Sequence, residues 1–450
     1  MNPLQRLFAA RNAIAASRLF DAELYRRTYL RRSVLKGRPL LHYLLFGERA
    51  GLRPNAFFDP NHYRQNLTAS GVTPGWSLLQ HCAENGATEM VAPSPEFHPR
   101  WYAWQNPDWN HGGTYTQPLA HFLHVGLLQL RDPSPFIDLR RHLSALGPDA
   151  IAAPAAAILA ELRRDGRLHG KGITADFADL KARQVTFRDE LNYDVLRRGR
   201  PSRPNLVYIQ SGRETNPPYL VHHRSFDVLR NYYVDPGTDV CRDSEHVLFQ
   251  RGTKVTGIYA ILRHDPELLL AYDNVLFLDD DIALEADDIA RLFAIMDRHG
   301  IALAQPLLTP DSDCVWPVFR DARHAGRIVP VNSVEVMMPA FSRDALRRLA
   351  GTFAETVSGF GIDLLWGQTL AAEREAGRIA LIGEVCARHQ KGIDDVDGAF
   401  YVFLANHGIN PKLELWMMMS MYGVVPEFRT LDQEHEGRGS APHPARGIAP

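Results

Sequence analysis

Short apolar runs alternate with amphipathic segments along the second half of the chain, from about residue 205 onward. Four segments are nearly continuous apolar runs of the kind found in buried strands: residues 206–209, 274–278, 301–306 and 379–385. Residues 285–299 instead carry apolar side chains at helical spacing, and another helix is predicted from residues 251–254 to about residue 270. This alternation predicts an α/β sheet whose ligands lie at the carboxyl ends of the strands.

A different pattern recurs along the first third of the chain, with a period of 38 to 40 residues. Four markers keep it: Phe20, Phe58, Phe97 and Phe136; His42, His81 and His121; Gly47, Gly86 and Gly126; Pro54, Pro93 and Pro133. Each unit is predicted to form two short helices, the second ending at its glycine in the left-handed conformation. A single unit cannot bury its apolar face, so neighbouring units should stack. One histidine per unit, without a companion ligand at fixed spacing, indicates a packed, hydrogen-bonded side chain rather than a metal site.

The segment between these two patterns is rich first in alanine and then in proline and arginine, which is typical of a connector. We therefore predict an all-α repeat domain over residues 1–147, a helical linker over 148–204 and an α/β domain over 205–428. The first strand of the α/β domain is expected at residues 205–210. Residues 429–450 have few apolar side chains and are predicted to be a disordered tail.

Composition and charge narrow the classes of protein to which the chain can belong. Its 450 residues suit about two to four domains, and 45% hydrophobic with 23% charged residues excludes bulk disorder. The 50 basic and 52 acidic residues give a net charge of −2, which argues against a nucleic-acid binder with a globally basic surface. The four cysteines form no CxxC pair, so we expect a reducing compartment and neither a disulfide framework nor a zinc knuckle.

The first 40 residues carry nine basic and two acidic side chains, a net charge of +7, interleaved with apolar ones such as Leu4 and Phe8. Two interpretations stay open for this segment: contact with an anionic membrane surface, or a solvated helix that packs on its own domain. No run approaches the roughly 20 apolar residues of a membrane span, and arginines interrupt any apolar core of signal-peptide type. The expected location is the cytoplasm, with peripheral contact at the inner face of the cell membrane left open.

Three consecutive carboxylates, Asp279, Asp280 and Asp281, follow one of the predicted strands. Ionised aspartates are too costly to bury unpaired, so they must face solvent, a cation or a ligand. Asp279 and Asp281 are two residues apart and point the same way on an extended chain. Together they can hold a hard divalent cation that also binds phosphate oxygens. The alternative is an acidic turn that caps the following helix.

Three further residues are candidates for chemistry. Lys254 stands at the start of a predicted helix, where backbone N–H groups and a cation suit phosphate. Asp363 follows a glycine-containing turn at the front of a helix and is either a general base for an acceptor hydroxyl or an N-cap. His389 ends a predicted strand and is either a metal ligand or an exposed loop histidine. Asp394, close behind it, is an alternative third ligand.

The order of these motifs, with the Met-Pro-Ala-Phe-Ser-Arg segment at 338–343, resembles the GT-A fold of nucleotide-sugar-dependent glycosyltransferases over about residues 205–410. The resemblance implies a role for each candidate. Metal would be held by Asp279, Asp281 and His389, the nucleotide would lie near Arg213, Asn216, Lys254, Asp279 and Asp280, and the catalytic base would be Asp363. The N-terminal units resemble the aromatic repeats that often precede bacterial polysaccharide glycosyltransferase domains, with His42-Tyr43-Leu44 and Asn106-Pro107-Asp108 as the closest matches.

This resemblance implies a metal-dependent hexosyl or related sugar transferase of bacterial surface polysaccharide biosynthesis. The donor would be a nucleotide sugar, the acceptor a hydroxyl of a glycan or lipid-linked glycan, and the cofactor Mg²⁺ or Mn²⁺. We expect an inverting displacement and no nucleic-acid partner, with protein partners at the repeats left open. The alternative is a non-catalytic scaffold of a polysaccharide assembly complex with a degenerate transferase fold.

Two departures from the family pattern matter. The family often has Glu-Asp where this chain has Ile362-Asp363, so only one carboxylate is available there. The Gln-x-x-Arg-Trp signature of processive synthases is absent, which favours the addition of one or a few sugars. The central expectation is that the acids and His389, far apart in sequence, meet in one cleft around a divalent ion.

Overall fold

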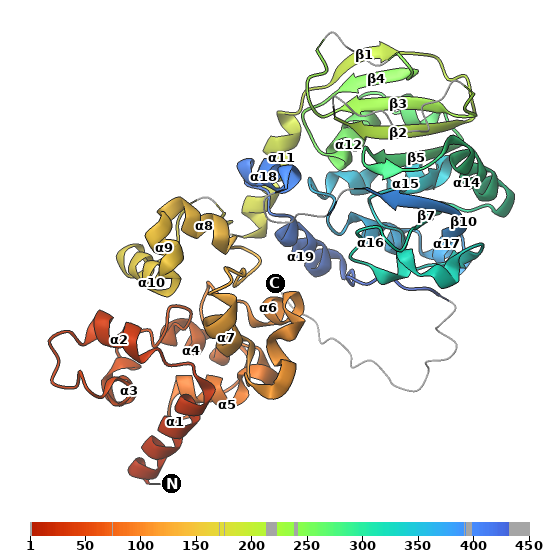
Figure 1. Cartoon of the computed structure of the whole chain (residues 1–450). Helices are drawn as coiled ribbons and strands as arrows, with labels where there is room; N and C mark the ends of the chain where they lie inside the picture. Colours follow the sequence, from red (N-terminus) through yellow and green to blue (C-terminus); the bar gives the residue numbers. More distant parts are fainter. Residues whose placement is uncertain are drawn as a thin grey trace. The chain divides into compact units, whose positions relative to one another are not determined.

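The computed structural model (Figure 1) describes residues 2–73, 75–170, 172–174, 176–212, 223–237, 242–390, 392 and 398–431. The chain divides into two compact units, Met1–Asp179 and Leu180–Pro450. Arg213, Asn216, Asp394 and all but the first three residues of the predicted tail lie outside the described residues. Within the described ranges, no helix is both long and apolar enough to cross a membrane.

The first unit consists of short helices whose starts are explained by the residues before them. Its α-helices are α1 (Pro3–Ser17), α2 (Ala22–Tyr29), α3 (Pro39–His42), α4 (Pro60–Ala69), α5 (Leu78–Glu89), α6 (Pro99–Gln105), α7 (Pro118–His121), α8 (Leu139–Leu146), α9 (Pro148–Ala152) and α10 (Pro154–Asp165), and α11 (Phe177–Asp189) follows. Asp21, Asp59 and Asp138 each accept a hydrogen bond from a backbone N–H in the first turn of the helix that follows. The ring of His98 does the same before α6. These caps satisfy donors that the helix itself leaves unpaired.

In the fourth of the sequence repeats, the position of the recurring phenylalanine differs from the prediction. Isolated bridges join Ser94 to Phe97 and Ser134 to Ile137. Ile137, which directly precedes the capping Asp138, therefore occupies the position that Phe97 has in the third unit. The sequence pattern had assigned this position to Phe136.

The histidines of the pattern are hydrogen-bonded, as predicted, and the structure shows that the partner of each is a tyrosine. The hydroxyl of Tyr25 lies 3.0 Å from Nδ1 of His42, and the same contact recurs between Tyr63 and His81 at 3.1 Å and between Tyr102 and His121 at 2.9 Å. The repeated histidine is therefore explained by packing.

The prediction that the recurring glycines end helices in the left-handed conformation is wrong. Gly47, Gly86 and Gly126 all have negative φ. A Cβ at Gly47 would lie 2.2 Å from the hydroxyl oxygen of Tyr25, and one at Gly126 would lie 2.3 Å from that of Tyr102. These two glycines are needed because a tyrosine ring approaches the backbone too closely for any side chain.

The second unit is a mixed α/β structure around a mostly parallel sheet (Figure 1). Its strands are β1 (Asp194–Arg198), β2 (Asn205–Ser211), β3 (Asp227–Tyr232), β4 (His246–Phe249), β5 (Asn274–Asp279), β6 (Ile282–Ala283), β7 (Leu303–Leu308), β8 (Ile328–Pro330), β9 (Ala340–Ser342) and β10 (Ile379–His389). Their order is β1-β4-β3-β2-β5-β9-β7-β10-β6, with β8 paired to β10. Parallel pairing joins β4 to β3, β3 to β2, and β2 to β5, and it also joins β7 to β10. Strand β9 runs antiparallel between β5 and β7.

The four apolar runs do form strands β2, β5, β7 and β10, and residues 286–299 form helix α14 (Ala286–His299). Two predictions need correction. The helix expected to run to residue 270 is split into α12 (Lys254–His264) and α13 (Glu267–Leu270), because Pro266 cannot continue a helix. A strand, β1, precedes residue 205 and pairs with β4 at the end of the sheet.

The remaining helices of the second unit lie between or after these strands. They are α15 (Arg343–Leu349), α16 (Ile362–Thr369), α17 (Ala371–Glu375), α18 (Ala399–Asn406) and α19 (Pro411–Tyr422). The core between helices and sheet is apolar, with β2 and most of β5 fully buried.

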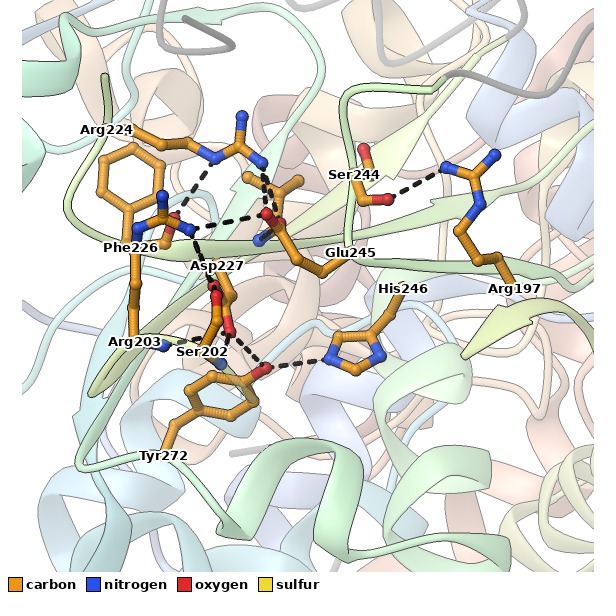
Figure 2. A network of polar contacts seen from close by, with 11 residues as sticks. Arg197, Ser202, Arg203, Arg224, Phe226, Asp227, Ser244, Glu245, His246 and Tyr272 are labelled. Atoms are coloured by element: carbon orange, nitrogen blue, oxygen red, sulfur yellow. Dashed lines mark hydrogen bonds and ion pairs between the residues drawn. The ribbon is translucent and has the colours of Figure 1, made fainter. Parts of the chain in front are cut away.

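Because the central strands are parallel, their amino ends lie along one edge of the sheet and their carboxyl ends along the other. At the amino edge, polar side chains from the first residues of β3 and β4 and from the segments just before β2, β3, β4 and β5 point toward one another (Figure 2). Asp227 accepts hydrogen bonds from the backbone N–H (2.7 Å) and hydroxyl (2.6 Å) of Ser202, and from the hydroxyl of Tyr272 (3.1 Å) and Arg203 Nη1 (3.2 Å). His246 Nε2 lies 2.8 Å from the Tyr272 hydroxyl.

A second carboxylate of the same edge is equally well paired. Glu245 accepts two hydrogen bonds of 2.8 Å from Arg224. We call this set the amino-edge network; its members are Ser202, Arg203, Arg224, Asp227, Glu245, His246 and Tyr272.

Candidate functional site at the carboxyl edge

Asp279 and Lys254 form an ion pair at the carboxyl edge of the sheet. Asp279 is the last residue of β5 and Lys254 the first residue of α12. The Nζ atom of Lys254 lies 2.8 Å from Asp279 Oδ1 and also donates to the main-chain oxygen of Met337 at 2.8 Å. Burial raises the pKa of Asp279, the ammonium of Lys254 opposes this, and the two neighbouring aspartates raise it further. Lys254 therefore holds the carboxylate of Asp279 and the main chain at Met337 close together.

Asp280 links the carboxyl ends of three neighbouring strands. Its Oδ2 accepts hydrogen bonds from the N–H of Gly212, just after β2, at 2.7 Å and from the hydroxyl of Tyr233, just after β3, at 3.4 Å. A Cβ at Gly212 would lie 2.8 Å from that hydroxyl, so the close approach requires glycine. Asp280 thus holds the chain at Gly212, the last described residue before Arg213 and Asn216 in the sequence.

Asp281 is brought to His389 by a short antiparallel pairing. Residue Ile282 of β6 is paired with His389 of β10, and Asp281 Oδ2 lies 3.4 Å from Nε2 of His389. The other ring nitrogen, Nδ1, donates to the main-chain oxygen of Asp313 at 2.9 Å. The contact with Asp281 raises the pKa of His389 to about 9, although burial opposes it. The imidazole is therefore protonated at neutral pH in this arrangement, and it is an oriented side chain rather than a free loop histidine.

Asp363 lies inside the first turn of α16 and does not cap it. The helix begins after Gly361, whose φ of 82° only glycine adopts easily. The side chain of Asp363 is buried, and its Oδ1 accepts the N–H of Leu364 at 2.9 Å. The carboxylate also accepts the backbone N–H of Val336. Burial raises the pKa of Asp363 to about 7 against the effect of these N–H groups, which is a suitable value for a general base near neutral pH.

Glu335 belongs to the same edge, although the sequence analysis did not single it out. It lies in the connection between β8 and β9. Its pKa is raised to about 8, chiefly by burial and also by the charges of Asp363 and Asp279, against the opposing effect of Lys254 and His389. Glu335 is therefore within electrostatic reach of side chains from four different elements. The available signal was a single carboxylate inside the otherwise apolar run of residues 334–341.

We call this group the carboxyl-edge cluster; its members are Lys254, Asp279, Asp281, Glu335, Asp363 and His389. The described residues also outline two pockets, one beside Arg327 and Thr430 and the other beside Gln368 and Gly423, and no member of the cluster lines either of them. Residues 213–222, which follow Gly212, and residues 391 and 393–397, which follow Gln390, lie outside the described residues.

Carboxylates and an imidazole are suitable ligands for Mg²⁺ or Mn²⁺, so the chemistry of Asp279, Asp281 and His389 fits such an ion. Their spacing is less favourable, because Asp279 is paired with Lys254. Among the described residues, no group of three or more His, Cys, Asp or Glu side chains is arranged to hold a metal. Asp281 and His389 already lie together and would share an ion once His389 has released its proton.

No protein-family model and no curated protein matches this chain. Solved structures that are similar in part include Staphylococcus aureus TarS, with a TM-score of 0.29 and 10% identity over 44% of this chain and 38% of that one. A TarS 1–349 structure in complex with UDP-GlcNAc has the same score and identity over 64% of its length. Glucosyl-3-phosphoglycerate synthase from Mycobacterium tuberculosis, in complex with Mg²⁺ and UDP, has a TM-score of 0.27 and 14% identity over 52% of this chain and 84% of that one.

These likenesses are too distant to carry an argument about this chain, which spans less than two thirds of either TarS structure. The class that the geometry itself defines is a mixed α/β protein with a polar cluster where its parallel strands end, the usual place for ligands in such sheets.

Proposed function

We propose that this chain is a metal-dependent glycosyltransferase that moves a sugar from a nucleotide-sugar donor to a hydroxyl of a glycan or lipid-linked glycan. The observation that carries the proposal is the carboxyl-edge cluster itself. Carboxylates, one lysine and one histidine from separate elements lie together where ligands of parallel sheets bind. The order of motifs that resembles the GT-A fold supports the same function.

In this proposal each residue has a defined task. Asp279, Asp281 and His389 would hold Mg²⁺ or Mn²⁺, which when bound offsets the negative charge of the diphosphate leaving group. Lys254 and Asp280 would lie beside the nucleotide, with Arg213 and Asn216 near its base and ribose.

Asp363 would accept the proton of the acceptor hydroxyl. The hydroxyl oxygen then forms a bond to the anomeric carbon as the bond from that carbon to the diphosphate breaks, with inversion. Three backbone N–H groups, those of Asp363 itself, Leu364 and Val336, donate to its carboxylate. A carboxylate has about four lone-pair sites, so one is left for the acceptor proton.

The N-terminal helix supports the membrane contact that we propose as a second feature. On α1, Leu4 and Phe8 are 68% and 59% exposed, and Arg11 lies one turn further along the same face. An anionic lipid surface would bury the two apolar side chains and attract the arginine. Leu4→Asp with Phe8→Asp should abolish co-sedimentation with phosphatidylglycerol vesicles. Unchanged binding by this variant would refute the contact.

The test of the function is donor hydrolysis, since many transferases slowly hydrolyse a nucleotide sugar without acceptor. A panel of UDP- and GDP-sugars is incubated with the protein and Mn²⁺, and release of the nucleoside diphosphate is measured. We expect one member to be hydrolysed and to raise the thermal midpoint of unfolding in the presence of Mn²⁺. If no member of the panel does either, the non-catalytic scaffold is the better account.

A further inference from the structure

The connection before β9 is placed at the carboxyl edge by the direction of that strand. β9 runs antiparallel to β5, with Ala340 opposite Leu276, and the N–H of Phe277 donates to the main-chain oxygen of Pro339 at 2.9 Å. Residues before Pro339 therefore continue past Phe277 toward Asp279. This explains how a residue far from the aspartate triplet in sequence joins the same edge.

Lys254 and Asp363 hold this connection in place on both sides of Glu335. Lys254, which holds Asp279, also holds the main-chain oxygen of Met337 at 2.8 Å. Asp363 accepts the N–H of Val336, and its own main-chain oxygen accepts the hydroxyl of Ser333.

The backbone of Glu335 is fixed as well. Its N–H donates at 2.7 Å to Oε1 of Gln305, a fully buried residue of β7. The position of Glu335 is thus fixed by Lys254, which we propose lies beside the nucleotide-sugar donor, and by Asp363, which we propose contacts the sugar acceptor.

The side chain of Glu335 lacks the partners that its burial calls for. Its Oε2 atom is buried and has no hydrogen-bond partner among the residues that the structure describes, while the residue as a whole keeps some exposure. A buried carboxylate oxygen without a donor is costly, so a ligand that donates a hydrogen bond there would be favoured. Ionised phosphate oxygens have no proton to donate to this atom, whereas sugar hydroxyls are neutral hydrogen-bond donors.

We propose that Glu335 accepts hydrogen bonds from hydroxyls of the transferred sugar and thereby selects the donor. This inference rests on the proposed function and adds to it the residue that recognises the glycosyl group. Glu335 lies between Lys254 and Asp279, which would face the diphosphate, and Asp363, which would face the acceptor. The transferred sugar must lie between diphosphate and acceptor, and therefore beside Glu335. Where the family that this chain resembles often has Glu-Asp, this chain has Ile362-Asp363. Glu335, from a different segment, would then supply the second carboxylate.

The experiment compares two ligands that differ only in the sugar. Binding of UDP and of UDP-glucose, UDP-GlcNAc or UDP-galactose, whichever binds the wild-type protein, is measured by calorimetry with Mn²⁺; GDP and GDP-mannose are used if the UDP series does not bind. Glu335→Gln keeps one acceptor oxygen and Glu335→Ala keeps none. Glu384→Gln, which alters an exposed carboxylate of β10, is the matched control.

We expect Glu335→Ala to weaken the nucleotide sugar at least tenfold while the nucleoside diphosphate changes less than twofold. Glu335→Gln should fall between, and Glu384→Gln should match the wild type. Equal weakening of both ligands in Glu335→Ala, with an unchanged thermal midpoint, would overturn the proposal in favour of a metal or phosphate role. No effect on either ligand would also overturn it. If the wild-type protein binds none of the probes, the proposed function itself fails, and this inference with it.

Discussion

The two edges of the same sheet carry charged residues in opposite states. At the amino edge, burial alone would raise the pKa of Asp227, but hydrogen bonds from Ser202, Tyr272 and Arg203 outweigh it and the pKa is lowered. At the carboxyl edge, burial prevails over the available partners and the pKa values of Asp363 and Glu335 rise to about 7 and 8. Carboxylates beside the amino ends of these strands are thus stabilised as anions, and those beside the carboxyl ends are destabilised as anions.

This difference separates structural charges from functional ones. A carboxylate whose lone pairs are filled by the protein has no capacity for a ligand, and its removal affects folding. A buried carboxylate with too few partners lowers stability, and such strained groups are typical of sites that bind or react. The amino-edge network is therefore expected to serve the fold, and the carboxyl-edge cluster to serve the chemistry.

The largest effect is expected for Asp363→Asn. Loss of the proposed base should lower sugar transfer about 10² to 10⁴-fold, measured as product formed from the donor found in the panel and its acceptor. Donor affinity should stay within about twofold, because the side-chain shape is kept and the base contacts the acceptor. Asp287→Asn, at an exposed position on α14, is the control. A loss of donor affinity equal to the loss of rate would reassign Asp363 to donor binding.

Asp227→Asn should show the opposite profile. Breaking a buried, hydrogen-bonded charge pair costs about 3 kcal/mol, toward the lower end of the usual range because Arg203 is partly exposed. Urea unfolding of the full chain measures this loss, and nucleotide binding by the folded protein should be unchanged. The comparison between the edges would fail if this variant kept full stability while Asp363→Asn lost it.

The pH dependence of stability, measured without divalent ions, should separate the edges by its sign. Asp363 and Glu335 keep their protons in the folded chain up to about pH 7 and 8, whereas the unfolded chain releases them near pH 4 to 5. Their contribution is therefore complete below about pH 4 and is lost as the pH rises toward 8.

Other groups complete that profile. His389, with a pKa raised to about 9, adds a further loss between about pH 6.5 and 9. Asp227, with a lowered pKa, contributes stability that is lost only as the pH falls below about 4. The double variant Asp363→Asn with Glu335→Gln should flatten the fall between pH 4 and 8. An unchanged slope would show that these carboxyls are not strained.

The smallest effect is expected for Lys254→Gln. Removal of one cation beside the proposed diphosphate should weaken UDP binding about tenfold, equivalent to about 1.4 kcal/mol. Arg251→Gln, which removes an exposed cation just before α12, should leave binding within about twofold. Equal effects of the two variants would indicate general attraction of the anion rather than a contact at the carboxyl edge.

Local patterns predicted most of the α/β fold. Continuous apolar runs predicted β2, β5, β7 and β10 because these strands are buried. The short antiparallel strands β6 and β9 carry too few residues for a periodic signal, yet β6 places Asp281 beside His389 and β9 directs Glu335 to the edge. Long-range pairing therefore decides part of the site, and single-sequence patterns do not contain it.

Candidate site residues could be predicted where charged side chains occur at positions that are costly for them. A run of three aspartates after an apolar strand draws attention because ionised groups are costly to bury, and the structure brings two of them to Lys254 and His389. For Glu335 the sequence signal was weaker, because it consists of a single acidic residue within an apolar segment. The recurring glycines of the first unit were misread for a related reason, since a tyrosine that approaches from a neighbouring helix leaves no trace in local sequence.

The most direct test of the central claim is calorimetric titration of the donor into wild-type protein and Asp281→Asn, each with Mn²⁺ and with a chelator. We predict that the wild-type protein binds the nucleotide sugar only with Mn²⁺. Asp281→Asn should lose this metal-dependent binding while it still unfolds in one cooperative transition, at a somewhat lower midpoint because its contact with His389 is weakened. Equal donor affinity of the two proteins, or equal affinity with and without Mn²⁺, would contradict a metal-dependent sugar-transfer site at the carboxyl edge.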